Sequence, residues 1–424
     1  MMIQLIRGFR DILPSDVPLW QRIEKTAVRL LEAYGFAEIR IPIMEKTELF
    51  ARSIGEATDI VEKEMYTFAV SQGAKKKADE LLTLRPEATA SIVRAYIQHK
   101  MYAGDPLHKF YMTGPMFRRE RPQKGRYRQF YQIDAEIFGT DSAYADVLLI
   151  SMLSELLLRL GVDDTTAHIN SLGCPECRPA YRDTLTAFIE SRADALCEDC
   201  RRRKTRNPLR VLDCKVPGCR EAMTEAPELI DHLCEACRDH FAIVTQSLDD
   251  LKVPYVLDKR LVRGLDYYTR TTFEIHTEAL GAQSAVAGGG RYDGLVEALG
   301  GPSIPATGFA IGFDRLAEIV AQKQPVTPPT PRLFIAPIGE AARTRAFPWF
   351  MALGQAGVAC EIEMGVRSLK AQMKRANRIG AEHVLIVGDD ELAQGAAILR
   401  NMHTKAQKEV PLDNLVADLA SELG

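Results

Sequence analysis

Residues 117–130 read Phe-Arg-Arg-Glu-Arg-Pro-Gln-Lys-Gly-Arg-Tyr-Arg-Gln-Phe, and this stretch decides the fold class. The strand-like run Lys109–Tyr111 precedes it and the run Gln129–Phe138 follows it. Pro122 and Gly125 interrupt the pattern between them, which predicts a turn joining two antiparallel strands. Glu38–Ile43 and Thr271–His276 also have the composition of strands, and strands and helices do not alternate strictly before residue 324. We therefore expect an α+β fold with an antiparallel sheet flanked by helices, not a doubly wound parallel sheet.

The same stretch carries six basic residues and one acid. Like charges on one hairpin repel each other unless an anion lies among them, and guanidinium groups match phosphate oxygens in geometry. Phe130 offers a ring on which a base could stack. A solvated basic loop is the alternative interpretation.

The composition bounds the class of protein. A chain of 424 residues predicts two or three domains. The net charge of −3 excludes a uniformly basic nucleic-acid-binding chain but allows a local basic patch. No apolar run approaches the ~20 residues that span a bilayer, and charges follow Met1 too soon for a signal peptide. We expect a cytoplasmic protein with no membrane partner.

The domain organisation follows from composition. Four prolines between Pro325 and Pro331 predict a stiff linker over residues 325–332. Residues 333–424 alternate short apolar runs with helical segments, which predicts a small α/β domain. Residues 1–324 form the first domain, and its polar, cysteine-rich stretch 165–250 is interpreted as an inserted, mainly helical subdomain.

Two further motifs carry polar side chains. Glu87 and Thr89 stand at the start of a predicted helix, where they could receive an ammonium group or simply occupy an ordinary helix N-terminus. Gln132, Asp134 and Glu136 alternate along a predicted strand and share one face. That face is either a wet pocket or, by default, exposed to solvent.

No phosphate-binding glycine loop of the P-loop or dinucleotide type is present, so any nucleotide would be held by arginines. The glycines of Ala287–Asp293 allow close backbone approach to a ligand. Leu261–Thr269 contributes Arg263. In Gly308–Leu316 a strand breaks at Gly312 and enters a helix carrying Arg315, whose alternative role is a structural ion pair.

Four cations in the last domain, spaced three, four and four residues apart, lie on one helical face. No acid falls between residues 364 and 381. The segregated charge favours contact with a phosphate backbone over a merely solvated face. These residues are Arg367, Lys370, Lys374 and Arg378.

Eight of the nine cysteines occur in four closely spaced pairs. Eight thiolates could hold two tetrahedral zinc ions, although free cysteines are also common as small buried hydrophobes. The spacing alone leaves both interpretations open. The paired residues are Cys174 and Cys177, Cys197 and Cys200, Cys214 and Cys219, and Cys234 and Cys237.

Together these motifs resemble histidyl-tRNA synthetases, a family of class II aminoacyl-tRNA synthetases. Ile39–Phe68, Phe117–Phe130 and Gly308–Leu316 resemble the three motifs of the class. Leu261–Thr269 and Ala287–Asp293 resemble the two histidine-specific motifs, and residues 331–424 the anticodon-binding domain. The resemblance implies a homodimer that joins histidine to ATP, with Mg²⁺, and transfers it to the 3′ end of tRNA(His).

The resemblance also implies residue roles. Arg263, Arg118, Glu87 and Gln132 would be catalytic. Histidine would be bound by Glu87, Thr89, Gln132, Glu136, Arg263, Tyr267, Tyr268 and Gly288. ATP would be bound by Arg118, Glu120, Arg126, Phe130 and Arg315. tRNA would contact the four cations of the last domain.

Two rival hypotheses differ in class. The first is a non-catalytic regulatory paralogue, similar to the partner subunit of ATP phosphoribosyltransferase in histidine biosynthesis, which would lack the anticodon-binding domain. The second is a zinc-dependent RNA-binding protein, which would leave the histidine-specific motifs unexplained.

Overall fold

The computed structural model describes residues 2–55, 58–70, 80–123, 125–278 and 285–424. Lys124, one of the six basic residues of the hairpin, lies outside them. The chain divides into two compact units, Met1–Val326 and Thr327–Gly424, and the division falls within the proline-rich stretch.

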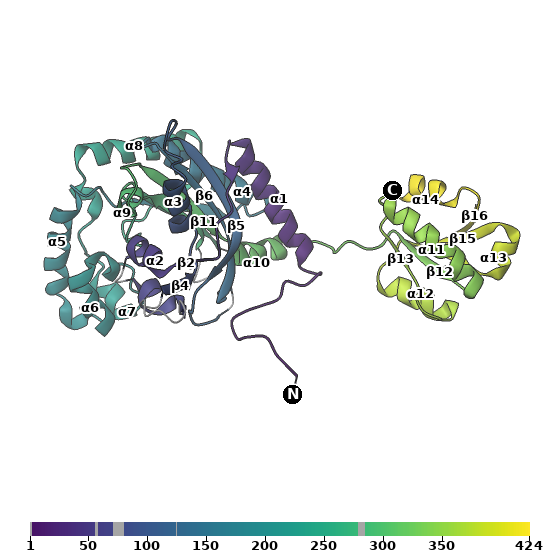
Figure 1. The fold of residues 1–424 in the computed structure, drawn as a ribbon. Helices are drawn as coiled ribbons and strands as arrows, with labels where there is room; N and C mark the ends of the chain where they lie inside the picture. The colour runs from purple at the N-terminus through teal and green to yellow at the C-terminus, as the bar shows by residue number, and fades with distance from the viewer. Residues whose placement is uncertain (1, 56–57, 71–79, 124, 279–284) are drawn as a thin grey trace, which may run out of the picture. The chain divides into compact units, whose positions relative to one another are not determined.

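The first unit is built on a sheet of eight strands in the order β1-β5-β6-β11-β10-β9-β7-β8 (Figure 1). β5 (His108–Phe117) and β6 (Gln129–Phe138) pair antiparallel, with Phe117 opposite Gln129. The predicted hairpin is confirmed, and β5 is longer than the run that signalled it. The edge pairs β1–β5 and β7–β8 are parallel, so the sheet is mixed.

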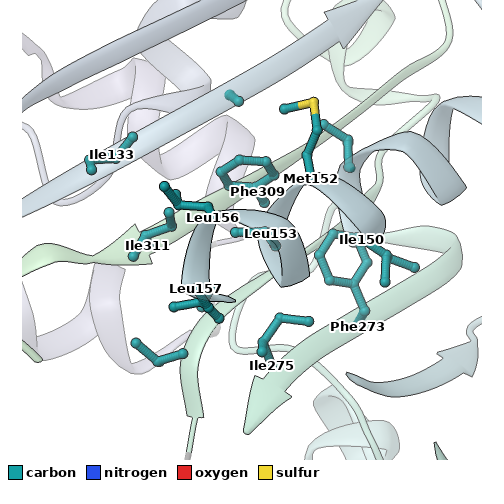
Figure 2. Packing of buried hydrophobic residues seen from close by; sticks show 14 of the residues in the cluster. Ile133, Ile150, Met152, Leu153, Leu156, Leu157, Phe273, Ile275, Phe309 and Ile311 are labelled. Carbon is teal, nitrogen blue, oxygen red and sulfur yellow. The ribbon is translucent and has the colours of Figure 1, made fainter. Parts of the chain in front are cut away.

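The remaining strands of this sheet are β1 (Ala37–Glu38), β7 (Thr165–Ser171), β8 (Tyr255–Leu257), β9 (Thr269–Thr277), β10 (Ala285–Arg291) and β11 (Ala306–Gly312). Helices α1 (Val17–Ala33), α4 (Ala143–Arg159), α8 (Glu235–Asp250) and α10 (Phe313–Lys323) contribute to the larger core on one face. In Figure 2, Leu153 and Leu156 of α4 lie over Ile133, Phe273 and Ile311 of the strands.

The opposite face of the sheet is covered by α3 (Thr89–Gln98) and the short helix α9 (Leu295–Ala298). Side chains alternate across the sheet, because successive residues of a strand point to opposite faces. Tyr111 lies in the first core, whereas Phe110 and Met112 pack with Ile92 of α3. The polar set of β6 points to the α3 face.

A smaller sheet has the order β2-β4-β3, formed by β2 (Met44–Lys46), β3 (Tyr66–Val70) and β4 (Glu80–Leu84). α2 (Thr47–Ile54) follows β2 directly. The prediction of a strand over residues 38–43 is therefore wrong in extent. Only Ala37–Glu38 pairs with β5 before the chain turns into β2.

The predicted insertion, 165–250, is too wide at both ends. β7 (Thr165–Ser171) pairs with β9 in the main sheet, and Phe241, Val244 and Leu248 of α8 belong to the main core. The separate helical part lies between them and contains α5 (Arg178–Glu190), α6 (Glu198–Arg206) and α7 (Pro217–Ala222). These three helices gather at one end of the unit in Figure 1.

The second unit has a five-stranded sheet in the order β13-β12-β14-β15-β16. Its strands are β12 (Leu333–Pro337), β13 (Cys360–Ile362), β14 (His383–Val387), β15 (Ala396–Asn401) and β16 (Gln407–Pro411). Its helices are α11 (Glu340–Gln355), α12 (Leu369–Arg378), α13 (Asp389–Gln394) and α14 (Leu415–Leu423). Mixed strands with helices agree with the predicted α/β class.

Candidate active site

The polar face of β6 is a buried pocket. Gln132, Asp134 and Glu136 are all buried beneath α3. The default expectation of a solvent-exposed face is therefore wrong, because helix α3, distant in sequence, covers it. Thr89 of α3 donates a hydrogen bond to Oε1 of Glu136 (2.6 Å), and the Tyr292 hydroxyl donates to Oε2 (2.5 Å).

Glu87 enters the same pocket from the N-terminus of α3. Its Oε1 accepts a hydrogen bond from the backbone N–H of Ala90 at 3.0 Å. Three buried acceptors of this pocket have no hydrogen-bond partner among the residues that the structure describes. They are Oε2 of Glu87, Oε1 of Gln132 and Oδ2 of Asp134. Buried acceptors are rarely left unpaired, so this pocket is suited to a ligand that donates hydrogen bonds.

The electrostatics of the pocket also favour a cation. Burial raises the pKa of Glu87, and burial together with neighbouring carboxylates raises the pKa values of Asp134 and Glu136 well above their usual range. Carboxylates gathered away from water disfavour their own ionisation. A positively charged ligand would restore it.

Glycine at position 308 is required by this arrangement. A Cβ on residue 308 would overlap Oε2 of Glu136, so any side chain would displace the carboxylate. Tyr267 and Tyr268 line the same region, with ring centroids 4.7 Å apart, and Tyr267 makes an edge contact with Tyr292 at 5.6 Å.

Arg263 lies beside the acidic pocket, on the loop before β9. It forms an ion pair with Glu274 of β9, and its guanidinium carbon lies 5.6 Å from the centroid of the Tyr268 ring. A Cβ on Gly288 would approach Nη1 of Arg263 to 2.5 Å, which explains why this strand residue is glycine. Burial raises the pKa of Glu274, but Arg263 and His276 outweigh burial and hold the pKa below its usual value.

An adjoining cavity of about 360 Å³ is lined by all five residues predicted to bind ATP, together with Gln132, Arg263 and Gly288. The predicted ATP residues are Arg118, Glu120, Arg126, Phe130 and Arg315. Five arginines and five carboxylates line it, and the guanidinium groups suit a ligand that carries phosphate groups.

Each cation of the cavity is held by a neighbour. Nε of Arg118 donates to the Pro86 carbonyl at 2.9 Å, and its guanidinium carbon lies 5.2 Å from the centre of the Phe130 ring. Arg126 pairs with Glu120 at 3.3 Å. Burial lowers the pKa of Arg315, and the nearby positive charge of Arg126 lowers it further. A bound anion would relieve this crowding.

The structure separates the five basic residues of the hairpin that it describes. Arg118 and Arg126 line the cavity, whereas Arg119 and Arg121 are exposed. Arg128 donates instead to the backbone carbonyls of Glu120 and Arg7. The interpretation as a wholly solvated basic loop is therefore wrong for the two cavity residues and right for the two exposed ones.

Two residues of the site were not predicted. Glu274 pairs with Arg263 but stands in the strand run 271–276, where an acid carries no signal of its own. Tyr292 binds Glu136 and belongs to the predicted Ala287–Asp293 motif, in which only the glycines were considered. A tyrosine two residues after the last glycine of the run was the available clue.

The four cations of the second unit are exposed, and they lie on α12 and in the segment just before it. Arg367 pairs with Glu363 at 3.5 Å, so the separation from acids predicted from sequence is incomplete. Lys370, Lys374 and Arg378 form no ion pair with any acid in the part of the chain that the structure describes.

The eight paired cysteines form two clusters of four. In each cluster the four sulfur atoms lie within 4.8 Å of one another. Cys174 and Cys177 join Cys234 and Cys237. Cys197 and Cys200 join Cys214 and Cys219. All eight are free thiols.

A family model described as histidyl-tRNA synthetase matches residues 8–316, and one described as anticodon binding domain matches residues 332–422. The chain belongs to the histidyl-tRNA synthetase family. A protein of Desulfatibacillum aliphaticivorans named histidine–tRNA ligase is 59% identical over 99% of both chains. One of Desulforapulum autotrophicum with the same name is 58% identical over 99% of both.

Among solved structures, the apo histidyl-tRNA synthetase of S. aureus is 35% identical, with a TM-score of 0.81 over 99% of this chain and 100% of that one. The function expected from sequence is thus confirmed: the enzyme is a class II aminoacyl-tRNA synthetase that ligates histidine to tRNA, and ATP is a substrate. Nothing in these comparisons favours the regulatory paralogue. Among the described residues, no helix is long and apolar enough to cross a membrane.

Proposed function

We propose that histidine binds in the acidic pocket beneath α3 and ATP in the arginine-lined cavity beside it. The observation that carries the proposal is the set of three buried, unpartnered acceptors on Glu87, Gln132 and Asp134. The substrate ammonium offers three donors and a positive charge to this set. Glu87, Thr89 and Gln132 would bind it.

The imidazole of the substrate is recognised by Glu136 and Tyr268. Glu136 already accepts two hydrogen bonds, from Thr89 and Tyr292, which fix its carboxylate in place. A buried polar site of this kind penalises substrates that leave it unpaired. Apolar side chains of similar size would therefore be rejected, and Tyr267 would close the pocket around the ring.

Arg263 and Arg118 stabilise the first reaction step. A carboxylate oxygen of histidine attacks the α-phosphorus of ATP, the bond to the bridging oxygen breaks, and pyrophosphate leaves. Negative charge grows on the α-phosphate oxygens, and guanidinium groups fixed beforehand lower the barrier. Gly288 lets the Arg263 guanidinium lie against the strand, so the group stays close to both reacting atoms.

The rest of the nucleotide is held by the other cavity residues. Phe130 and Arg315 would enclose the adenine, Glu120 would accept from its exocyclic amine, and Arg126 would bind the distal phosphates. In the second step the 3′-hydroxyl of the terminal adenosine of tRNA(His) attacks the adenylate carbonyl. The ester forms and AMP leaves.

Mg²⁺ would accompany the triphosphate. The carboxylates of Glu64, Glu120 and Glu274 line the cavity and provide the oxygen ligands that this ion prefers. Glu120 and Glu274 are paired with arginines, as are the other two carboxylates of the lining, Asp59 and Asp314. Glu64 is therefore the best placed. The ion would neutralise phosphate charge. Zinc, bound by the cysteine clusters, would be structural.

The remaining assignments concern assembly and location. The small sheet exposes apolar side chains from all three strands or their ends, an arrangement that suits burial against a second copy. They are Ile43, Met44, Phe68, Val70 and Leu81. The enzyme would act as a homodimer in the cytoplasm, with the cations around α12 contacting tRNA.

Exchange of labelled pyrophosphate into ATP, measured without tRNA against a panel of amino acids, tests the proposal. We expect exchange with histidine alone. Exchange that is equally fast with other amino acids would contradict the assignment of the acidic pocket. Absence of exchange from folded protein supplied with Mg²⁺ and ATP would contradict the two-site arrangement.

A further inference from the structure

We infer that the two cysteine clusters are mononuclear zinc sites that hold the helical insertion against the loop carrying Arg263, so that zinc supports histidine activation without touching substrate. The inference rests on the proposed role of Arg263. It concerns which metal is bound, where it is bound, and what the insertion does for the active site.

The sulfur geometry fits one tetrahedral zinc ion per cluster. Zn–S bonds of about 2.3 Å place the sulfurs of a tetrahedron about 3.8 Å apart. The distance is 3.5 Å from Cys174 to Cys177, and 3.9 Å from Cys174 to Cys234 and from Cys197 to Cys214. Iron–sulfur clusters spread their cysteines farther apart, because several iron and sulfide atoms lie between them.

Backbone amides support both clusters in the same way. The N–H of Cys234 donates to the sulfur of Cys177 at 3.2 Å, and the N–H of Cys197 donates to the sulfur of Cys219 at 3.1 Å. Such hydrogen bonds favour thiolates and orient them as ligands. Four thiolates select a soft metal such as zinc.

The cysteines form a large part of the insertion's own core. Its separate core contains twelve buried residues, and four of them are cysteines from the two clusters. Small folds with so little apolar core depend on metals or disulfides. The first cluster joins the segment that leaves β7 to the start of α8, and therefore closes the base of the insertion.

The second cluster holds the segment that reaches the active site. Between Cys200 and Cys214, Arg210 donates to the Arg263 carbonyl at 2.8 Å, and Asn207 donates to Asp266 at 2.8 Å. Arg203 of the same segment pairs with Asp59, which lines the ATP cavity, at 2.7 Å.

Leu209 and Leu212 of this segment also pack with Val262 and Tyr268 of the loop. A cavity of about 990 Å³ lies between the rest of the insertion and the loop. From the first cluster, Arg178, which follows Cys177, donates to the Tyr268 carbonyl. The backbone of the loop is therefore held at Arg263 and at Tyr268 by side chains whose own positions depend on the cysteine clusters.

Metal analysis of protein purified without chelator tests the sites. We expect two zinc per chain in the parent and in Cys360→Ser, a control for the one cysteine outside the clusters, which lies in the second unit. Cys174→Ser and Cys214→Ser should each lose one zinc. Zinc well below one per chain in the parent, or iron in its place, would overturn the metal assignment.

Kinetics test the coupling. Cys214→Ser and Arg210→Met should each lower kcat/KM for histidine in pyrophosphate exchange by ~10-fold or more, as loss of supporting residues does. Arg210→Met should keep both zinc ions, so it separates positioning from folding. Wild-type exchange by Arg210→Met would overturn the coupling. Failure of exchange in the parent itself would instead contradict the proposed function.

Discussion

Two arginines, the buried Arg291 and the partly buried Arg263, come from the two segments that resemble the histidine-specific motifs, and they serve opposite purposes. The Arg291 side chain has no exposed surface. It pairs with Asp146 at 3.0 Å and Asp293 at 3.1 Å, and it donates to the carbonyls of Thr140 and Ser142 at 2.9 and 2.8 Å. Acceptors of the protein thus surround its guanidinium group.

Arg263 is only partly satisfied by the protein. It pairs with Glu274 and lies over Tyr268, but its Nε has no partner within the described ranges, and it lines the cavity proposed for ATP. The structural role of Arg291 and the substrate-binding role proposed for Arg263 can be distinguished by what their donors contact. A buried cation that has used its donors supports the fold, whereas one that keeps donors facing a cavity is available to a substrate.

Loss of the buried ion pair between Arg291 and Asp146 should produce the largest effect. Arg291→Met leaves the buried carboxylate of Asp146 without its main partner, and loss of one member of a buried pair costs about 3–5 kcal/mol. Chemical denaturation measures the free energy of unfolding. Arg159→Met, which breaks an exposed pair with Glu155, is the control and should cost less than about 1 kcal/mol. Equal losses would contradict the account.

The free energy of unfolding that Arg291→Met loses should depend on pH. Burial raises the pKa of Asp146, but Arg291 and His240 outweigh burial and lower it. The pair therefore stabilises the parent above the unfolded pKa of about 3.9, and the contribution is lost as pH falls through the folded value. In Arg291→Met the carboxyl can protonate instead. The difference in unfolding free energy should shrink between neutral pH and pH ~4; a constant difference would exclude Asp146 as its cause.

Glu136→Gln should produce the next largest effect, in the acidic pocket beside Arg263. The amide offers one oxygen acceptor where the carboxylate accepts from Thr89 and Tyr292 and would, under the proposal, also bind the substrate imidazole. We expect kcat/KM for histidine to fall about 10²-fold, the equivalent of one lost charged hydrogen bond. Pyrophosphate exchange measures it, with KM for ATP as the internal control. A comparable rise in KM for ATP would contradict the assignment of Glu136 to the histidine pocket.

Glu274→Gln should have a smaller effect, because Glu274 acts through Arg263. Removing the charge loosens the guanidinium but leaves it in place, so we expect kcat for exchange to fall ~10-fold with little change in KM for histidine. Glu274→Asp should recover part of the rate. A rise in KM alone, or no recovery by aspartate, would contradict a positioning role.

The cations around α12 should give the smallest effect. Lys370→Ala combined with Lys374→Ala should weaken tRNA binding and reduce its salt slope by about two, because each lysine would neutralise one phosphate. Pyrophosphate exchange should not change. Lys408→Ala, which removes a lysine paired with Glu422 in the same unit, is the matched control. An unchanged slope in the double variant would place the RNA-binding surface elsewhere.

The sequence predicted those parts of the molecule that local pattern controls. The turn at Pro122 and Gly125, the break at Gly312 and the start of α3 all follow from residue types that restrict the backbone. The strand near residues 38–43 is shorter than its composition predicts, because pairing with β5 ends after two residues. A partner strand, not propensity, decides where a strand stops.

The parts that sequence missed depend on contacts between distant segments. The polar face of β6 looks exposed until α3 covers it, and Glu274 gains its role only when β9 brings it to Arg263. Cysteine spacing identified four pairs but could not show that Cys174 shares a cluster with Cys234. The start of the insertion differs from the prediction because β7 is too polar to be recognised as a sheet strand.

The most direct test of the account is the single-turnover rate of adenylate formation by Arg263→Ala, measured beside its free energy of unfolding. We predict a rate at least ~10²-fold below the parent, as expected for loss of a preorganised cation at the transition state, with stability close to that of the parent and histidine binding still measurable. A variant that forms adenylate at the parent rate, or one that loses activity only because it unfolds, would contradict the assignment of Arg263 to the chemistry.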